Sequence, residues 1–301
     1  MKASDYRRLC RWVDQAAGHG RRSRQQFSDA VIVKVYFWAT CNDLAVSGAC
    51  DVRQWPAGLA DEVAATLPSQ STMSRRLRSV GVLQLIERLQ LLLAENLRRE
   101  YVVKVIDSKP LAVGNYSKDR DARRGRAAGA MARGYKLHAL TAGQAFLRWT
   151  LTAMNVSDQT AAGSLLATLG RGEDAWGYVV ADNGYDANAL HERAASANHQ
   201  LLAPPRKSNE HVRDVRRNTP QRIRSLDLCA QPLRHAGVGE SFGKDLLRYR
   251  GQIERNLGNA TMSGLRSPPP WVRRPHRLAP WAAAKIIQRM LRQLQIEELR
   301  T

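Results

Sequence analysis

In the first third of the chain, apolar residues recur at spacings of three and four, the period of helices that are apolar on one face. This pattern predicts helices over residues 6–17, 28–40, 59–67, 71–80 and 82–98. Pro68, Ser69 and Gln70 separate the third helix from the fourth, and Ser71 is suited to cap the fourth. A short helix, a tight turn and a second polar helix are typical of a helix-turn-helix, although an ordinary helical bundle has the same pattern.

The pattern changes near residue 101, where β-branched residues gather in short runs. These runs predict strands over residues 101–106, 135–141, 146–153, 177–181 and 200–203. Helical spacing predicts helices over residues 158–169, 187–198, 245–259 and 281–298, with Ser157 or Asp158 capping the first of them. Residues 112–134 are expected to form a loop rich in Gly and Arg. Three successive strands followed by alternating helices and strands predict an α/β fold with a mixed sheet flanked by helices.

Basic residues outnumber acidic ones by 47 to 27, for a formal net charge of +20 and an isoelectric point near 10.6. Such a field attracts polyanions, because each phosphate that is neutralised releases counterions from a nucleic acid. The charge is concentrated in residues 112–134, in a weakly patterned insertion around 204–240, and on the predicted polar helix. The arginines expected to contact DNA in the helix and the insertion are Arg75, Arg76, Arg78, Arg213, Arg216 and Arg217.

Other compositional features exclude several classes of protein. No apolar run approaches the roughly 18 to 20 residues that span a bilayer, and the polar N-terminus does not have the pattern of a signal peptide. The four cysteines have neither the spacing of a zinc site nor that of a redox pair. We therefore expect a cytoplasmic protein with reduced thiols and no membrane partner.

Three acids have the placement that a catalytic site requires. Asp107 and Asp182 each follow a predicted buried strand, so we expect both at the carboxyl edge of the sheet, where α/β folds commonly build sites. Glu254 lies on a predicted helix. Carboxylates gathered there repel one another unless a hard divalent cation joins them, and two such ions support phosphoryl transfer. Alternatively, the aspartates only form turns or caps, and Glu254 only pairs with Arg250.

Four segments carry a resemblance to a known family. They are Val105-Ile-Asp-Ser-Lys-Pro110, Arg133-Gly-Tyr-Lys-Leu-His138, Val180-Ala-Asp-Asn-Gly-Tyr-Asp186 and Arg250-Gly-Gln-Ile-Glu-Arg255. With these segments in this order, residues from about 100 to 290 resemble bacterial insertion-sequence transposases of the DDE type, whose catalytic domain has a ribonuclease H-like fold. The resemblance implies a helical DNA-binding domain over residues 1–98 and a catalytic domain over 99–301.

The resemblance also implies roles for individual residues. Asp107, Asp182 and Glu254 would be the catalytic triad that binds two Mg²⁺ ions, with Mn²⁺ able to substitute. Arg250 matches the arginine of the family's tyrosine-arginine-glutamate-lysine signature and would grip a phosphate, as would Lys136 and His138. The tyrosine and lysine of that signature are replaced by Leu247 and Thr261.

We therefore predict a transposase that cuts and joins double-stranded DNA at the terminal inverted repeats of its element, with a homodimer bringing two ends together. The expected reaction is water attack at an element end, followed by attack of the freed 3′-hydroxyl on target DNA. Two alternatives remain open: a catalytically impaired, transposase-derived DNA-binding protein, and a metal-dependent nuclease of the same fold.

Overall fold

The structure is a computed structural model that describes residues 1–18, 26–98, 102–127, 129–172, 175–205, 214–230 and 242–300. The chain divides into two compact units. Unit 1 contains Met1–Asn96 together with Ala260–Thr301, and unit 2 contains Leu97–Asn259. Among the described residues, no helix combines the length and the apolar character needed to cross a membrane. All four cysteines are free thiols.

Unit 1 is helical, as predicted, and is built around a buried helix. Its helices are α1 (Ala3–Ala17), α2 (Asp29–Cys41), α3 (Val46–Ala49), the 3-10 helix η1 (Val52–Gln54), α4 (Gln70–Arg76), α5 (Val80–Leu97) and α11 (Pro275–Glu298). The side chain of Ser28 caps α2 by accepting a hydrogen bond from the amide of Val31. From Ile32 to Cys41 every residue of α2 is buried, because a helix that is apolar all round is stable only at the centre of a bundle.

The helix predicted over residues 59–67 is wrong. Turns occupy residues 57–63, and the backbone at Gly58 is in the left-handed region, at φ +75°. Leu59 and Val63 are nevertheless buried, so their apolar spacing reflects packing rather than a helix. The next helix, α4, begins one residue earlier than predicted, and its cap is the side chain of Ser69, not Ser71. The helix-turn-helix as predicted therefore lacks its first helix.

The C-terminal helix α11 belongs to unit 1, which differs from the predicted assignment of residues 99–301 to a single domain. Lys285 on α11 is 1% exposed, and its ammonium donates to the backbone oxygen of Thr40 at 2.7 Å and to the carboxylate of Asp43 at 2.8 Å. A buried ammonium is stable only when such partners replace water. This contact joins segments that are far apart in the sequence, and no local pattern indicates it.

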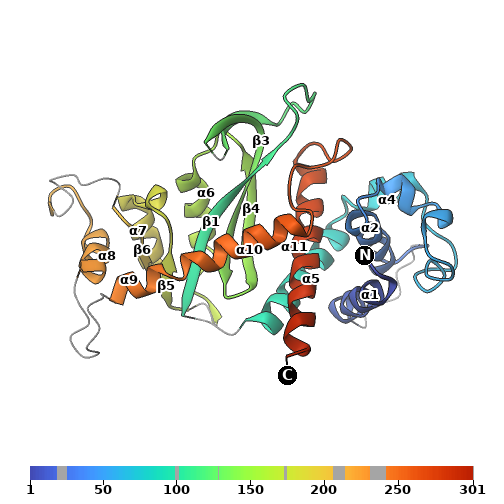
Figure 1. Cartoon of the computed structure of the whole chain (residues 1–301), viewed down its shortest axis with the longest axis horizontal. Coiled ribbons are helices and arrows are strands. Elements are labelled where there is room, and N and C mark those ends of the chain that lie inside the picture. Colours follow the sequence, from blue (N-terminus) through green and yellow to red (C-terminus); the bar gives the residue numbers. More distant parts are fainter. Residues whose placement is uncertain are drawn as a thin grey trace. The chain divides into compact units, whose positions relative to one another are not determined.

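Unit 2 contains a six-stranded mixed sheet, which confirms the predicted fold class (Figure 1). The strands are β1 (Val103–Ala112), β2 (Arg123–Ala127), β3 (Ala130–Ala142), β4 (Ala145–Ala153), β5 (Gly177–Val180) and β6 (His199–Leu202). Their order is β2-β3-β1-β5-β6, and β4 also pairs with β3. The pairs among β1 to β4 are antiparallel, whereas β1, β5 and β6 are parallel. This is the arrangement expected of a ribonuclease H-like sheet.

Helices cover this sheet and connect its strands. Helix α6 (Asp158–Leu166) is capped by Ser157, as predicted, and α7 (Asn188–Ser196) lies between β5 and β6 in the chain. Both pack on a core that includes Ile106, Leu140, Leu165, Val179, Leu190 and Leu201. The remaining helices are α8 (Pro220–Ala230), α9 (Phe242–Leu247) and α10 (Arg250–Met262).

Two predicted elements of unit 2 differ from the structure. The loop expected over residues 112–134 contains β2 and the first part of β3, because these residues pair in register despite their polar composition. The single helix expected over residues 245–259 is two helices, α9 and α10.

The role of Lys285 leads to a stability prediction. Lys285→Ala should lower the free energy of unfolding by about 2–3 kcal/mol, because it leaves the carbonyl of Thr40 without a donor and removes a packed side chain. Urea unfolding would measure this. Lys2→Ala, at an exposed lysine of the same unit, is the control and should change stability by less than about 0.5 kcal/mol. Equal effects of the two substitutions would contradict a structural role for Lys285.

Candidate functional site

The register of two parallel strands places Asp107 beside Asp182. Val105 on β1 pairs with Val180 on β5, where β5 ends. Asp107 and Asp182 each lie two residues further along, so they are at the same level on adjacent segments, which in a sheet are about 4.8 Å apart. Strand β1 continues beyond Asp107 to Ala112, further than predicted, so Asp107 lies within β1 but beyond the end of its parallel partner.

Both aspartates are half-buried and are held by backbone amides. The carboxylate of Asp107 accepts a hydrogen bond of 2.7 Å from the amide of Ser108. The carboxylate of Asp182 accepts one of 2.8 Å from the amide of Gly184 and caps the short helix η3 (Asn183–Tyr185). Asp107 also points away from the core around Ile106, because neighbouring residues of a strand face opposite sides.

Glu254 reaches the same region from helix α10. Its side chain is 64% exposed, and one oxygen lies 3.9 Å from the guanidinium of Arg250. Helix α10 is buried at Ile253 and Leu257. Between these two residues, the buried amide of Asn256 donates a 2.7 Å hydrogen bond to the carbonyl of Gly143, in the turn between β3 and β4. This contact fixes α10 against the sheet of unit 2.

The pKa of Asp107 reflects its burial and the charges around it. The pKa of Asp107 is raised to about 6, chiefly because burial disfavours its charged form. The hydrogen bond from Ser108 and the charge of Arg250 lower this pKa, whereas the carboxylates of Asp182 and Glu254 raise it further. The structure therefore brings together the four residues that the sequence singled out from three separate segments.

The side chains of Asp107, Asp182 and Glu254 are all carboxylates, the ligands that a hard divalent cation prefers. Their spacing is wider than that of a formed metal site. Within the described ranges, no group of three or more His, Cys, Asp or Glu side chains is close enough to hold a metal ion. A bound ion would thus require these side chains to move closer together, and that of Glu254 is the most exposed of the three.

Tyr185 lies close to Asp107, Asp158 and Asp182. Tyr185 is buried, and its pKa is raised well above the usual value by burial and by the charges of Asp107, Asp158 and Asp182. Sequence analysis treated Asp158 only as a helix cap. The only sequence signal for Tyr185 was its place in the segment that carries Asp182.

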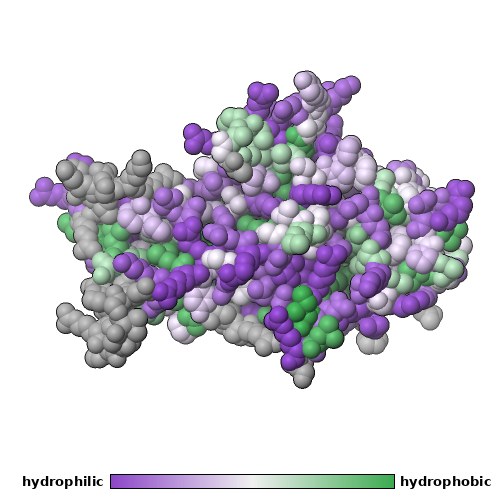
Figure 2. Space-filling model, viewed as in Figure 1, coloured by the Kyte–Doolittle hydropathy of each residue, from purple (hydrophilic) through white to green (hydrophobic). Residues whose placement is uncertain are grey.

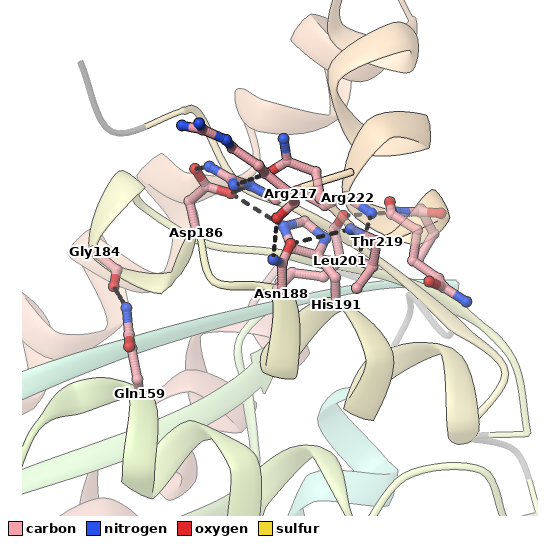
Figure 3. Close-up of polar contacts among 12 residues, drawn as sticks. Gln159, Gly184, Asp186, Asn188, His191, Leu201, Arg217, Thr219 and Arg222 are labelled. Atoms are coloured by element: carbon pink, nitrogen blue, oxygen red, sulfur yellow. Dashed lines mark hydrogen bonds and ion pairs between the residues drawn. The ribbon is translucent and has the colours of Figure 1, made fainter. Parts of the chain in front are cut away.

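A buried polar network holds the segment that follows Asp182 (Figure 3). Asp186 accepts two hydrogen bonds from the guanidinium of Arg222 on α8, at 2.7 and 2.6 Å. His191 on α7 contacts the same carboxylate at 3.3 Å, and its ring is buried. Because Asp186 and Arg222 are 36 positions apart, no local pattern in the sequence indicates their contact.

Two further contacts in Figure 3 complete this support. The side chain of Gln159 on α6 donates to the carbonyl of Gly184 at 2.9 Å. Asn188 donates to the carbonyl of Arg217 at 2.9 Å and accepts from the amide of Thr219 at 3.2 Å. The segment with Asp182 is therefore fixed by α6 on one side and by the 217–222 segment on the other.

Lys136 and His138 lie on one side of β3, as predicted, but both are engaged within the protein. The ammonium of Lys136 is 3.2 Å from the carboxylate of Asp158. His138 is 1% exposed and hydrogen-bonds to the hydroxyl of Thr152 at 2.8 Å. Burial lowers the pKa of His138 to about 4, so its ring is neutral at pH 7. A buried, neutral ring does not fit the predicted contact with a DNA phosphate.

The three arginines in α4 and just after it differ in exposure. Arg75 and Arg78 are exposed, whereas Arg76 is 7% exposed. The guanidinium of Arg76 donates to the carbonyl of Phe27 at 2.8 Å and to the carboxylate of Asp29 at 2.6 Å. Arg76 therefore joins α4 to the start of α2, which differs from its predicted contact with DNA.

The basic insertion is described only in part. Arg213 lies outside the described residues. Arg216 and Arg217 are exposed, and Arg217 lies 3.6 Å from Asp214. In the space-filling view, hydrophilic residues also gather over α10, the helix of Glu254 (Figure 2).

A basic cavity lies next to the segment with Asp182. Its volume is about 580 Å³, and it is lined by Arg124, Arg126, Lys136, Asp158, Gln159 and Gly184, among others. Arg124 and Arg126 are exposed on β2, with Gly125 buried between them. A Cβ atom at Gly125 would lie 2.2 Å from the carbonyl oxygen of Met154, so β2 approaches this neighbour as closely as only glycine allows.

Comparisons with known proteins give one strong match. A family model described as the transposase DDE domain matches residues 98–267. None of the curated proteins matches the chain. A solved structure of the piggyBac transposase synaptic complex with hairpin DNA is 11% identical, with a TM-score of 0.45, over 98% of this chain and 73% of that one. The Mos1 transposase paired-end complex with left transposon end is 15% identical, with a TM-score of 0.24, over 83% and 82%.

The burial of His138 gives a prediction about pH. The unfolded chain takes up a proton near pH 6.5 and the folded protein only near pH 4, so His138 costs stability as the pH falls through this range. At pH 5 the cost should be about 2 kcal/mol. His138→Gln should remove this part of the difference in urea unfolding between pH 7 and pH 5. An unchanged difference would show that His138 is not buried as a neutral ring.

Proposed function

Because this chain belongs to the transposase DDE domain family, we propose that it is a DNA transposase of an insertion sequence, which cuts and joins DNA at the ends of its element. Transposases of this family generally use divalent metal ions. The observation that best supports the proposal is the alignment of Asp107 with Asp182 just beyond the parallel pairing of β1 with β5, with Glu254 near enough to raise the pKa of Asp107.

We propose that Asp107, Asp182 and Glu254 are the catalytic residues and hold two Mg²⁺ ions, with Mn²⁺ able to substitute. The protein supplies carboxylate oxygens, the ligands that such hard cations prefer. When bound, the ions activate the attacking oxygen and stabilise the leaving oxygen of an in-line displacement. The proposed reaction is hydrolysis at an element end, followed by attack of the freed 3′-hydroxyl on target DNA.

The chain's own side chains would position the phosphodiester. The guanidinium of Arg250, one helical turn from Glu254, offers two parallel N–H donors to a phosphate near the cut. Asn256 fixes α10, and Gln159, Asp186 and Arg222 fix the segment with Asp182. These contacts would keep helix α10 and the segment with Asp182 in place before DNA binds, so that little free energy is spent on ordering the backbone of the site during the reaction.

Double-stranded DNA is the proposed partner. Its sequence-independent contacts would be made by Arg124 and Arg126 beside the segment with Asp182, and by Arg213, Arg216 and Arg217 of the insertion. Unit 1 would recognise the element end through Arg75 on α4 and Arg78 just after it. Transposition joins two ends, so we propose that two copies of the chain act together.

Two features favour the alternative functions. Leu247 and Thr261 replace the tyrosine and lysine of the family's signature, which would suit a descendant that binds DNA without cutting it. A nuclease of the same fold would cut DNA without regard to the ends of an element.

Cleavage of supercoiled DNA that carries the gene's own flanking sequences tests the proposal. In Mg²⁺ the wild type should cut at the element ends, and EDTA should abolish cutting. Glu254→Gln should lower the rate by about 100-fold or more, the scale for losing a group that stabilises the transition state.

The control is Glu192→Gln, at an exposed glutamate on α7, which should cut like the wild type. Cutting that persists in Glu254→Gln would remove Glu254 from the site. DNA binding without cutting by the wild type would favour the DNA-binding descendant, and cutting at random positions would favour the nuclease.

A further inference from the structure

Unit 1 contains a cavity that the proposed chemistry does not use. It has a volume of about 250 Å³ and is lined by residues of α4 and of the segment around the start of α11, including Arg78, Trp271 and Arg277. Its apolar lining comes from the buried residues Tyr36 and Leu77. Helix α4 is the one that we propose contacts the element end. The cavity therefore lies next to the expected DNA-binding surface.

The charge of this cavity is not compensated. Arg78 donates through Nε to the carbonyl of Ser74 at 3.0 Å, and Arg277 donates to the carbonyl of Trp271 at 3.5 Å. Since a guanidinium has five N–H donors, both arginines keep several for another ligand. Over the described ranges, neither arginine pairs with a carboxylate, and no acidic residue lines the cavity. Arg76 on the same helix, by contrast, is paired with Asp29.

The remaining lining adds apolar contact surface. Trp271 is 43% exposed, and the buried residues Val272 and Pro280 lie beside it in the lining. The cavity is smaller than the roughly 300–1,000 Å³ of sites for drug-sized ligands. It therefore suits a small group with an anionic part and an apolar part. A phosphodiester with its deoxyribose has this combination, with the phosphate on the arginines and the sugar carbons on the apolar surface.

We propose that this cavity holds one phosphodiester and its sugar from the DNA duplex that α4 contacts. The inference rests on the proposed function in taking DNA as the ligand. It adds Arg277 and Trp271, which follow the catalytic acids in the sequence, to the recognition of DNA by unit 1. Residues before and after unit 2 in the sequence would thus form one DNA-binding surface on unit 1.

Binding of a labelled duplex carrying the gene's own flanking sequence, followed by fluorescence anisotropy in EDTA, tests this inference on the full chain. Arg277→Gln should weaken binding by about 5- to 30-fold and reduce the slope of log affinity against log salt by about 1. The control is Arg11→Gln, which removes the same charge at an exposed arginine on α1 and should change binding by less than about 2-fold.

Trp271→Ala tests the apolar part of the site separately from its positive charge. It should weaken binding by about 3- to 10-fold and leave the salt slope unchanged, because it removes apolar contact but no charge. Circular dichroism should show native helix content in all three variants, since each substitution is at an exposed side chain.

Several outcomes would overturn the inference. Equal losses in Arg277→Gln and Arg11→Gln would mean that only net charge matters, and unchanged binding in Arg277→Gln would remove the site. If deoxyadenosine monophosphate bound the wild type but not Arg277→Gln, while duplex affinity stayed equal, the cavity would serve a free nucleotide instead. If the wild type binds and cuts DNA, these outcomes rule out only the proposed site in the cavity. If the wild type binds no DNA, the proposed function is contradicted as well.

Discussion

The parallel pairing of β1 with β5 is the constraint on which the candidate site depends. Backbone hydrogen bonds fix the register of these strands, and the register puts Asp107 and Asp182 at the same level although 75 positions separate them in the sequence. Val179 and Val180 face opposite sides of the sheet and both are fully buried, so β5 is packed into the core on both of its faces. The apolar core thereby determines the position of two carboxylates that do not belong to it.

This placement has an energetic cost that the surrounding structure offsets. Burial, with a smaller contribution from repulsion by the carboxylates of Asp182 and Glu254, raises the pKa of Asp107 to about 6, so its charged form is disfavoured in the folded protein. Bidentate contact between Arg222 and Asp186, and the bond from Gln159 to Gly184, hold the neighbouring segment despite this repulsion. Such local strain is common at sites where function, rather than stability, determines the residues.

Much of the fold could be predicted from the sequence because its signals are local. Runs such as Gly177–Val180 are apolar and β-branched, and an acid directly after such a run indicates a sheet edge. The acids of the site could therefore be predicted from the sequence, whereas the residues that hold them in place could not. Arg222, Asn256 and Lys285 make their contacts with residues distant in the sequence, and burial of a polar side chain has no periodic pattern. For the same reason Arg76 and His138, which look like surface residues in the sequence, are buried partners in the structure.

The central claim is that the three acids act together as a site for divalent cations, and the thermal unfolding of Asp107→Asn tests it most directly. Without metal at pH 7.5, the substitution should stabilise the protein by up to about 2–3 kcal/mol, because it removes a carboxylate whose ionisation the fold disfavours. Adding Mg²⁺ should raise the unfolding midpoint of the wild type and of the exposed control Asp121→Asn, but not that of Asp107→Asn. An Asp107→Asn protein that is less stable than the wild type and still responds fully to Mg²⁺ would contradict the account.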